Sequence, residues 1–405
     1  MLPSGWEMEF VENIFNVQLG KMLNKAAKEQ FPQFQYLGNT NVKWGYFELS
    51  DLKSMFFNEK EKEKFSLLNG DILMCEGGEV GRCAIWKLGQ KDIFFQKALH
   101  RLRSKGSITP EYFQNYMKFI AGTKLLDDST TRTSIAHLTR EKLLKLPIKV
   151  PPIHEQRKIA QILSTWDKAI STTESLIANS QQQKKALMQQ LLTGKKRFAG
   201  FDDQWEEKPL SEVAQVIVSP VDKKTIDGEI SVELCNYTDV YYNITITRKI
   251  QFMKATAKQT EIDKYTLKIG DVIITKDSET PGDIAIPSLV SEDLNGVVCG
   301  YHLAIIRPNS NIIDDSFLNQ LFSMQKTRYY FFTLATGATR FGLSIGGINK
   351  AHFKSPPLAE QQKIATVLTT TDQEIDTLQQ KLAYLKQEKK ALMQQLLTGN
   401  RRVMI

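Results

Sequence analysis

A gapless internal repeat constrains this chain more than any other feature of its sequence. PPIHEQRKIAQILSTWDKAI begins at Pro151, and PPLAEQQKIATVLTTTDQEI begins 205 residues later, at Pro356. The match continues through KKALMQQLLTG in both copies and covers residues 151–197 and 356–402. Because the period is about half of the 405 residues, the chain is a duplicated module and not a solenoid of short repeats.

Weaker similarity precedes each copy, in the same order. The pairs of segments that carry it include GDILMCEGGEVGRCAI from Gly70 with GDVIITKDSETPGDIAI from Gly270, ITPEYFQNYM from Ile108 with IDDSFLNQLF from Ile313, and TSIAHLTREKL from Thr133 with LSIGGINKAHF from Leu343. We therefore predict a globular segment over residues 1–150 with a helix over 151–197, and a second pair over 198–355 and 356–405. The globular segments have diverged while the helices have not, which indicates two related but different tasks on one frame.

The repeated segment is predicted to be a long helix with a coiled-coil seam. Pro pairs precede each copy, and Gly194 and Gly399 suit the position that follows a helix. Apolar residues recur in steps of three and four, which is the period of a coiled coil. They are Ile159, Leu163, Trp166, Ile170, Ile177, Leu187 and Leu191 in the first copy, and Ile364, Leu368, Ile375, Leu378, Leu382, Leu385, Leu392 and Leu396 in the second. About 39 helical residues at ~1.5 Å each form a rod of ~60 Å.

Neither seam is covered by its own helix, so we expect the two helices to pack on each other in antiparallel orientation. The alternative is that each helix packs only on its own globular segment. Lys184 and Lys389 occupy seam positions, where a charged group is unfavourable. Either their stems extend out of the seam, or their ammonium groups meet acidic residues of another subunit.

The globular segments are predicted to have a mixed α/β fold of the α+β kind. Runs typical of strands and bounded by Gly and Pro lie at 71–75, 84–87, 271–275, 284–286 and 302–306, and helical patterns lie at 111–121 and 316–326. The order lacks the regular alternation of a doubly wound sheet. CEGGEVGR at 75–82 predicts a hairpin turn. The expected architecture is two such domains separated by a long antiparallel two-helix coiled coil, as a pseudo-two-fold duplication.

Motifs for catalysis and metal binding are absent from the sequence. It contains no GxxxxGK[ST] phosphate loop, no GxGxxG after a strand and no HExxH or CxxC pair. His100 and His302 fall in similar places of the two halves, but no nucleophile accompanies them. We therefore expect structural or solvent-facing imidazoles, no metal, and no cofactor bound by this chain.

Cysteine usage and hydropathy indicate a cytoplasmic protein. The four cysteines are widely spaced and are expected to be reduced thiols. No apolar run approaches the ~18 residues of a membrane span, and the acidic N-terminal segment lacks a signal-peptide core. The net charge of +8 permits nucleic acid as a partner without requiring it.

Basic and aromatic residues interleave in the segments that differ most between the halves. Lys and Arg neutralise phosphates, and Arg also reads guanine through two hydrogen bonds. For any single residue a solvated surface position is the simpler reading, but as a set they favour nucleic acid. The residues predicted to bind it are Lys43, Trp44, Arg82, Lys97, Arg101, Arg132, Thr133 and Arg140 in the first half, and Lys223, Lys224, Tyr241, Lys276, His302, Thr339, Arg340 and Lys350 in the second.

Two loops place one arginine among small residues that allow a close approach to a groove. They are STTRTS at 129–134 and ATGATRFG at 335–342. Arg132 and Arg340 precede SIAHL and SIGGI, so we expect them to be matched residues that each serve one half of a DNA site.

The arrangement resembles the specificity (S) subunit of type I restriction-modification systems over essentially the full length. The segments PPIHEQRKIAQIL and PPLAEQQKIATVL, each followed by LMQQLLTG, carry the likeness most specifically. GFDDQWEEKPLSEV and the GDIL and GDVI runs also fit that family. No short tandem repeat of the kind that adjusts spacing in some members precedes the second globular segment.

The resemblance implies a division of labour. Each globular segment is expected to be a target recognition domain that reads one half of a bipartite, asymmetric site in double-stranded DNA. The helices are expected to be conserved spacers that also bind two methyltransferase subunits, with restriction subunits joining the complex. The S subunit itself has no catalytic activity. S-adenosylmethionine is expected in the methyltransferase subunits, and ATP with Mg²⁺ in the restriction subunit.

Three alternatives stand beside this reading. The first is a coiled-coil scaffold that binds only proteins. The second is the specificity subunit of a related stand-alone DNA methyltransferase system, and the third is an enzyme. The missing motifs argue against an enzyme. Loss of DNA affinity with rising salt distinguishes a DNA reader from a protein scaffold.

Overall fold

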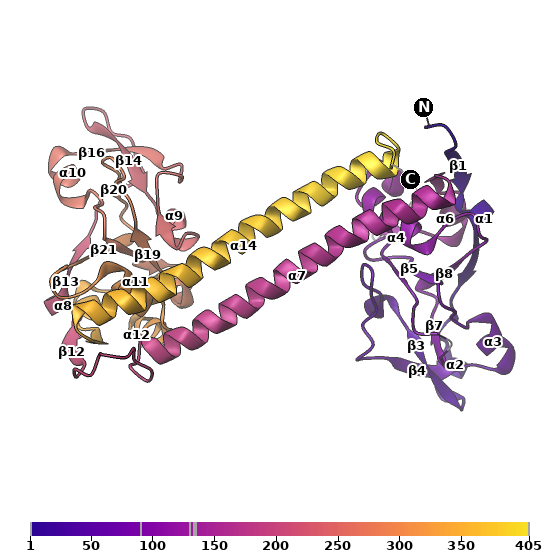
Figure 1. Cartoon of the computed structure of the whole chain (residues 1–405), viewed down its shortest axis with the longest axis horizontal. Coiled ribbons are helices and arrows are strands. Elements are labelled where there is room, and N and C mark those ends of the chain that lie inside the picture. The colour runs from indigo at the N-terminus through magenta and orange to yellow at the C-terminus, as the bar shows by residue number, and fades with distance from the viewer. Residues whose placement is uncertain (1, 90, 129–130, 133–135, 404–405) are drawn as a thin grey trace. The chain divides into compact units, whose positions relative to one another are not determined.

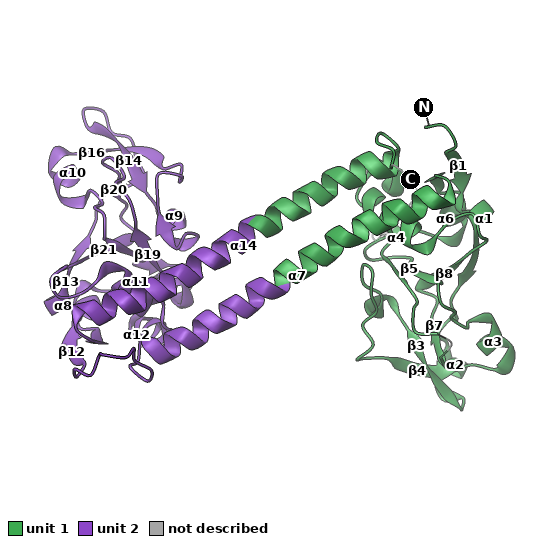
Figure 2. Ribbon diagram, viewed as in Figure 1, with its two compact units in different colours: residues 1–174, 381–405 green, residues 175–380 purple. Residues whose placement is uncertain are grey.

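The computed structural model describes residues 2–89, 91–128, 131–132 and 136–403 (Figure 1). It forms two compact units. Unit 1 comprises residues 1–174 and 381–405, and unit 2 comprises residues 175–380 (Figure 2). Each unit therefore combines one globular segment with part of both long helices.

Unit 1 is built on two small sheets, with strand orders β2-β8-β5-β6 and β4-β3-β7. The central strand β5 carries Ile72 and Met74 into one hydrophobic core and Leu73 and Cys75 into another, so all four of its residues are buried. This explains why the run is apolar without alternation. The strands are β1 (Glu7–Phe10), β2 (Phe15–Leu19), β3 (Gln33–Leu37), β4 (Lys53–Phe56), β5 (Ile72–Cys75), β6 (Cys83–Ile85), β7 (Ile93–Phe95), β8 (Leu99–Ser104), β9 (Thr131–Arg132), β10 (Ala136–His137) and β11 (Pro147–Val150).

Short helices cover the sheets of unit 1. They are α1 (Val11–Ile14), α2 (Lys25–Glu29), the 3-10 turn η1 (Asn39–Asn41), α3 (Glu59–Lys64), α4 (Pro110–Ile120), α5 (Lys124–Asp128) and α6 (Arg140–Leu144). Helix α4 begins at Pro110, where the missing N–H costs nothing, and the Thr109 side chain caps it by accepting from the Tyr112 N–H. Its Tyr112, Phe113 and Tyr116 are buried in the core.

Unit 2 repeats this plan with one extra strand. Its sheets have the orders β13-β21-β17-β19-β15 and β16-β14-β20. The strands are β12 (Glu206–Pro209), β13 (Ala214–Val218), β14 (Ile230–Cys235), β15 (Thr245–Ile246), β16 (Met253–Ala257), β17 (Val272–Thr275), β18 (Asp277–Ser278), β19 (Pro287–Val290), β20 (Val298–Cys299), β21 (Leu303–Pro308), β22 (Phe341–Gly342) and β23 (His352–Ser355). Its short helices are α8 (Leu210–Val213), α9 (Tyr237–Tyr241), α10 (Gln259–Tyr265), η2 (Pro281–Asp283), α11 (Asp315–Ser323), α12 (Gln325–Leu334) and α13 (Ile345–Asn349).

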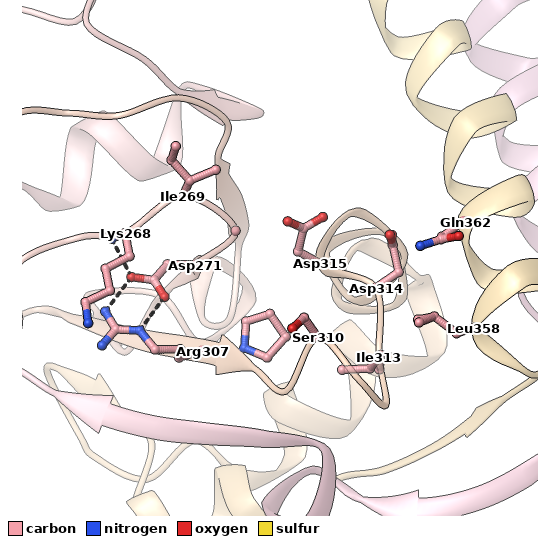
Figure 3. Close-up of a pocket in the computed structure, with 12 residues that line it drawn as sticks. Lys268, Ile269, Asp271, Arg307, Ser310, Ile313, Asp314, Asp315, Leu358 and Gln362 are labelled. Atoms are coloured by element: carbon pink, nitrogen blue, oxygen red, sulfur yellow. Dashed lines mark hydrogen bonds and ion pairs between the residues drawn. The ribbon is translucent and has the colours of Figure 1, made fainter.

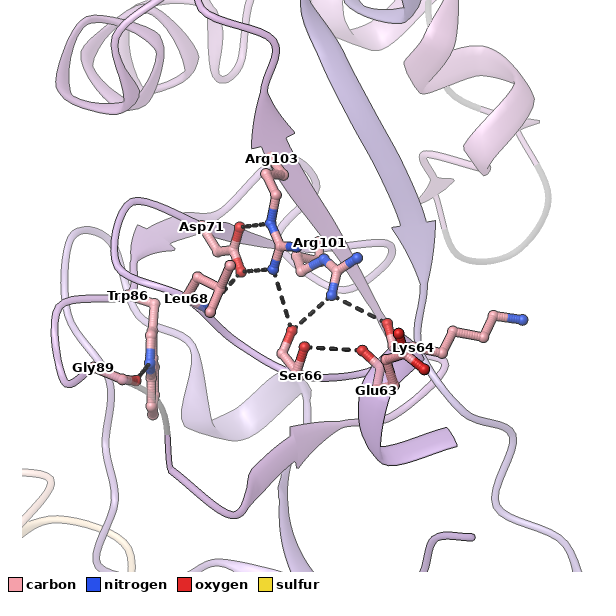
Figure 4. A network of polar contacts seen from close by, with 9 residues as sticks. All are labelled: Glu63, Lys64, Ser66, Leu68, Asp71, Trp86, Gly89, Arg101 and Arg103. Carbon is pink, nitrogen blue, oxygen red and sulfur yellow. Dashed lines mark hydrogen bonds and ion pairs between the residues drawn. The ribbon is translucent and has the colours of Figure 1, made fainter. Parts of the chain in front are cut away.

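One buried carboxylate fixes the central strand in each unit. The Asp71 carboxylate accepts two hydrogen bonds of 2.7 Å from Arg103 on β8, and one of 2.7 Å from the Leu68 N–H (Figure 4). Asp271 makes the same contacts with Arg307 on β21 and with the Lys268 N–H. Because Asp71 and Asp271 are each 1% exposed, the bidentate guanidinium contact compensates for their desolvation. The repeated Gly-Asp of GDIL and GDVI is thus a structural device.

The two long helices are α7 (Ile153–Leu191) and α14 (Leu358–Thr398), and they pack antiparallel within each unit. In unit 1, Asp167 and Glu174 of α7 pair with Lys389 and Lys386 of α14, in reverse order along the chain. In unit 2, Lys184 pairs with Asp372. The predicted helix pair and its seam are confirmed: all the apolar seam residues named above are buried or half-buried.

The seam lysines find partners that we did not expect. Lys184 Nζ lies 2.5 Å from Asp372 Oδ1, and Lys389 Nζ lies 2.5 Å from Asp167 Oδ1. Both ion pairs form within this chain, between the two helices. The lysine side chains therefore need not extend out of the seam, and no acidic residue of another subunit is required to pair with them. The two ion pairs are equivalent in the internal repeat. Lys184 corresponds to Lys389 and Asp167 corresponds to Asp372, each 205 residues later in the chain.

The Glu-Gln of the repeated motif joins each helix to its surroundings. Gln156 accepts from the Thr109 N–H and donates to the Pro151 carbonyl, and Gln361 does the same with Asp314 and Pro356. The preceding glutamates bind arginines that follow the other helix. Glu155 pairs with Arg402 in unit 1, and Glu360 pairs with Arg197 in unit 2.

Two element predictions are wrong. Residues 284–286 are not a strand: Ala285 has a left-handed φ of 56° after the 3-10 turn η2, and β19 begins only at Pro287. The helix expected at 316–326 is two helices that meet at Met324, whose backbone is extended. Phe322 and Phe331 stack at 5.5 Å, whereas nine residues of a continuous helix turn them about 180° apart.

The repeat alignment before the long helices also needs correction. Helices α6 and α13 are capped by Thr139 and Ser344, which are 205 residues apart. LTREKL therefore corresponds to LSIGGI, and not TSIAHL. The predicted correspondence between His100 and His302 also changes. Cys75 pairs with Leu99 and Thr275 with Leu303, so His100 corresponds to Ala304 and His302 to Ala98.

Candidate functional site

Polar and aromatic side chains gather where the central strand of each unit ends. In unit 1 we call this group corner 1, and it comprises Asn39, Lys43, Trp44, Gly77, Glu79, Arg82 and His137. In unit 2 we call it corner 2, and it comprises Tyr237, Tyr241, Lys276, Asp277, Asp283, His302, Arg328 and Arg340. Each corner combines the loop after the central strand with the segment after the middle strand of the second sheet, β3 or β14. A short hairpin-like segment before α6 or α13 completes it.

Corner 1 is held by a glutamate and an arginine. Glu79 accepts from Trp44 Nε1 at 2.5 Å and from Arg82 Nη1 at 3.1 Å. Arg82 Nη2 also donates to the Asn39 carbonyl at 2.9 Å, and Asn39 Nδ2 donates to the Gly77 carbonyl at 3.1 Å. The loop of CEGGEVGR is the predicted hairpin turn, because β5 and β6 are antiparallel. Arg82 thus joins its own loop to the segment of Asn39, while the side chain of Glu79 remains 56% exposed.

Corner 2 has a different chemistry on the same frame. Tyr237 and Tyr241 of α9 stack at 5.5 Å, and the Tyr241 hydroxyl donates to Asp283 Oδ1 at 3.3 Å. The nearby Arg328 donates to the Gly282 carbonyl at 2.6 Å. Burial lowers the pKa of Arg328, although Asp283 and the tyrosines favour its charged form. A cavity of about 290 Å³ lies beside this group and is lined by Lys184, Tyr241, Tyr242, Gln320 and Arg328 among others.

Three further residues of corner 2 form a chain of contacts. Lys276 Nζ lies 2.8 Å from both carboxylate oxygens of Asp277, and His302 Nδ1 lies 3.3 Å from Asp277 Oδ2. Burial lowers the pKa of His302, opposed by the hydrogen bond to Asp277 and assisted by the charge of Arg340. Burial therefore favours the neutral form of the His302 imidazole.

The structure brings about half of the predicted nucleic-acid residues into these corners. Lys43, Trp44 and Arg82 lie in corner 1, and Tyr241, Lys276, His302 and Arg340 lie in corner 2. Thr339 is exposed beside Arg340. Lys97 is exposed next to Ala98, whose carbonyl accepts from the Glu76 N–H at the start of the corner 1 loop. Their contacts with DNA stay predictions.

The remaining predicted residues lie outside the corners. Arg101 donates to the carbonyls of Lys64 and Ser66 and ties the end of α3 to β8 (Figure 4). Arg140 donates to the Val17 carbonyl, Lys224 pairs with Asp222, and Lys223 and Lys350 are exposed. Arg132 is described only as part of β9, and Thr133 lies outside the described residues.

The expected match between Arg132 and Arg340 is wrong in detail. In unit 1, His137 pairs with Thr131 and bridges to Gly77. In unit 2, Gly342 pairs with Thr336 and with Asp277. His137 therefore corresponds to Gly342, and Arg132 corresponds to Gly337. The two arginines lie in the same loop but at different positions of it.

The sequence reasoning missed the acidic members of the corners. Glu79, Asp277 and Asp283 orient the neighbouring aromatic and basic groups, yet a search for phosphate-binding residues passes over carboxylates. Their signal was present: all three follow the Gly-Asp strand, inside the segments that pair in the internal repeat.

A second cavity of about 290 Å³ lies in unit 2 at the start of α14 (Figure 3). Asp271, Arg307, Asp315, Leu358 and Gln362 are among the residues that line it. The Asp271–Arg307 pair is already satisfied, and no residue of corner 2 contributes. No group of three or more His, Cys, Asp and Glu side chains able to hold a metal occurs in the described ranges. Nor does any helix of that part of the chain have the length and apolarity to cross a membrane.

Comparison with known proteins identifies relatives for both units. The model of the type I restriction modification DNA specificity domain matches residues 3–179 and 202–387. The type I restriction enzyme MjaVIII specificity subunit of Methanocaldococcus jannaschii is 22% identical over 99% of this chain and 94% of its own. The StySPI specificity subunit of Salmonella potsdam is 24% identical over 90% of this chain and 81% of its own.

Solved structures share the fold. The S subunit of a type I restriction-modification system from M. genitalium superimposes with a TM-score of 0.61 at 15% identity, over 97% of this chain and 96% of that chain. A chain from a study of complex assembly and conformational transition of the type I R-M system gives a TM-score of 0.59 at 18% identity, over 99% of this chain and 100% of that chain.

Proposed function

Because the chain belongs to the family of type I restriction modification DNA specificity domains, we propose that it reads a bipartite, asymmetric site in double-stranded DNA, with one half-site for each unit. Corner 1 and corner 2 are the surfaces proposed to read bases. Phosphate contacts by the surrounding lysines and arginines hold the register, while the base edges carry the sequence information.

The contrast between the two corners is the observation that carries this proposal. Both units share the same strand order, the same buried Asp–Arg pair and the same helix frame. At the equivalent end of the central strand, however, unit 1 offers Trp44, Glu79 and Arg82, whereas unit 2 offers Tyr241, Asp277 and His302. Different arrays of donors and acceptors select different bases in the major groove. Two different readers on one frame therefore favour an asymmetric site.

The exposed faces of the long helices support binding of two copies of one partner. Lys185, Gln189 and Gln190 are exposed on α7 and recur as exposed Lys390, Gln394 and Gln395 on α14. These six residues are not needed to pack the helix pair. Identical exposed positions in both copies fit two methyltransferase subunits. Restriction subunits complete the proposed complex.

We assign no catalytic step to this chain. In the proposed complex S-adenosylmethionine is bound by the methyltransferase subunits, and ATP with Mg²⁺ by the restriction subunit. The complex acts in the cytoplasm, where its DNA is. If the partner system lacks a restriction subunit, the same chain serves a stand-alone methyltransferase, and methylation without cleavage is the result that identifies this case.

Filter binding of the assembled complex at increasing salt tests the proposal. A subunit that neutralises several phosphates gives a steep linear fall of log affinity with log salt, of slope about −0.9 for each phosphate. A flat response contradicts DNA reading and favours the protein scaffold. Sequencing of methylated positions in cells that express the complex then gives the two half-sites.

A further inference from the structure

Each unit places one imidazole at the same corner, but from non-equivalent positions of the chain. In unit 1 the imidazole belongs to His137 of β10, which bridges to Gly77. A side chain at Gly77 has no room there, because its Cβ would lie 2.7 Å from His137 Nδ1. In unit 2 the glycine is the other member of the corresponding pair. Asp277 stands in place of Gly77, Gly342 stands in place of His137, and the imidazole comes from His302, just before β21.

The surroundings of His302 fix its position. The His302 carbonyl accepts from the Lys276 N–H at 2.8 Å, and the Tyr301 and His302 rings lie 3.6 Å apart. The side chains of His302 and Asp277 are 19% and 17% exposed. Gly342 leaves the space that Asp277 needs, since a Cβ there would lie 2.9 Å from Asp277 Oδ1. The imidazole is therefore oriented and still reaches the surface.

The contact with Asp277 determines which nitrogen carries the proton. A carboxylate can only accept, so Nδ1 of the neutral imidazole must donate to Asp277. Nε2 is then a bare acceptor, and the described residues supply no donor to it. Lys276 Nζ contacts both oxygens of that carboxylate at 2.8 Å. The Lys276–Asp277–His302 chain thus presents one fixed acceptor at corner 2.

We propose that His302 reads one base of the second half-site, by accepting a hydrogen bond at Nε2 from the exocyclic amine of adenine or cytosine. This inference rests on the proposed function and names the chemistry of one contact in it. In the major groove, adenine N6 and cytosine N4 are the donors, whereas guanine and thymine present acceptors at the same edge. The fixed acceptor therefore discriminates between the two classes. Asp277 is a positioning residue that sets the tautomer.

The Asp277→Asn variant distinguishes a role of His302 in reading a base from a merely structural role. Lys276 can donate only to the amide oxygen, which leaves the amide N–H₂ facing His302 Nδ1. The imidazole proton then moves to Nε2, and the acceptor becomes a donor. We expect the base at one position of the second half-site to change from adenine or cytosine to guanine or thymine, with the first half-site unchanged. Sequencing of methylated positions in cells that express the whole complex measures this.

His302→Phe removes the contact altogether. We expect discrimination at that position to fall by about tenfold or more, in proportion to the usual cost of one mismatched base pair. Fluorescence anisotropy of the assembled complex with duplexes that differ at this one position measures the ratio. His352→Phe is the matched control, because His352 is exposed on β23 and its ring contacts the Lys350 carbonyl, outside corner 2.

The outcomes separate this inference from the proposed function. If the unmodified complex methylates a bipartite motif and both variants keep that motif unchanged, the role of His302 is overturned and the proposed function stands. If the unmodified complex shows no bipartite motif, both fail. If His302→Phe does not assemble, Asp277→Asn decides alone: a changed base at one position supports the inference, and an unchanged motif overturns it.

Discussion

Lys389 Nζ of α14 lies 2.5 Å from Asp167 Oδ1 of α7, and the internal repeat makes the same contact a second time between Lys184 and Asp372. Lys389 is 11% exposed at its side chain, whereas Asp167 is 44% exposed. The lysine is therefore the partner that depends on the pair. A charge that is retained in a coiled-coil seam and paired across it fixes the register of the two helices.

Removal of either partner should have unequal effects. Asp167→Ala leaves a nearly buried ammonium group without its counter-charge, and we expect the free energy of unfolding to fall by about 1–3 kcal/mol. Lys389→Met leaves a carboxylate that water can still reach, and places an apolar chain in the seam, so we expect less than half of that loss. Thermal unfolding followed by circular dichroism compares the two variants. Equal losses would contradict the assignment of Lys389 as the dependent partner.

The Glu155–Arg402 pair makes unit 1 sensitive to acid. Burial opposes ionisation of Glu155, but hydrogen bonds from Arg402 and Trp6 outweigh it and hold the pKa of Glu155 below its ordinary value. The stability gained from the ionised form is fully present above the ordinary pKa of about 4.3, and it is lost as the pH falls through the lower pKa of the folded state. Glu155→Gln should remove this part of the acid dependence. We expect a shallower fall of the melting temperature below about pH 4 than in the unmodified protein, and identical slopes would refute the claim.

A charge inserted into the seam should disrupt the helix pair. Leu382 is half-buried in the seam, while its neighbour Ala383 is exposed. We expect Leu382→Glu to cost about 2–4 kcal/mol, because it places a carboxylate without a partner among apolar side chains. Ala383→Glu changes the same charge on the outer face and should cost less than about 0.5 kcal/mol. Gel filtration with the methyltransferase partner measures assembly, and a normal complex for Leu382→Glu would argue against a seam at this residue.

The frame was predictable from the sequence because local rules determine it. Gapless repetition, a 3.5-residue period and flanking Pro and Gly were enough to place α7 and α14. The break at Met324 was not predictable, since stacking of Phe322 on Phe331 is a tertiary contact that overrides a continuous helical pattern. The partners of Lys184 and Lys389 also depend on the antiparallel register, which pairs residues about two hundred positions apart.

The site was predictable only in part. Trp44, Tyr241 and His302 emerged from residue type and position, but their orientation depends on Glu79, Asp283 and Asp277, which a search for basic residues does not select. Arg82 and Arg101 are of the residue type that binds DNA, yet both donate hydrogen bonds to backbone carbonyls of their own unit, one from Arg82 and two from Arg101. The exchange of Gly77 and His137 for Asp277 and Gly342 became visible only through strand register.

The central claim is that each unit reads its own half-site, and one pair of variants tests it most directly. Trp44→Ala alters corner 1, and Arg340→Ala alters an exposed residue of corner 2. Sequencing of methylated positions in cells that express each complex should show a relaxed first element of the motif for one variant and a relaxed second element for the other. An effect of both variants on the same element, or on neither, would contradict the account.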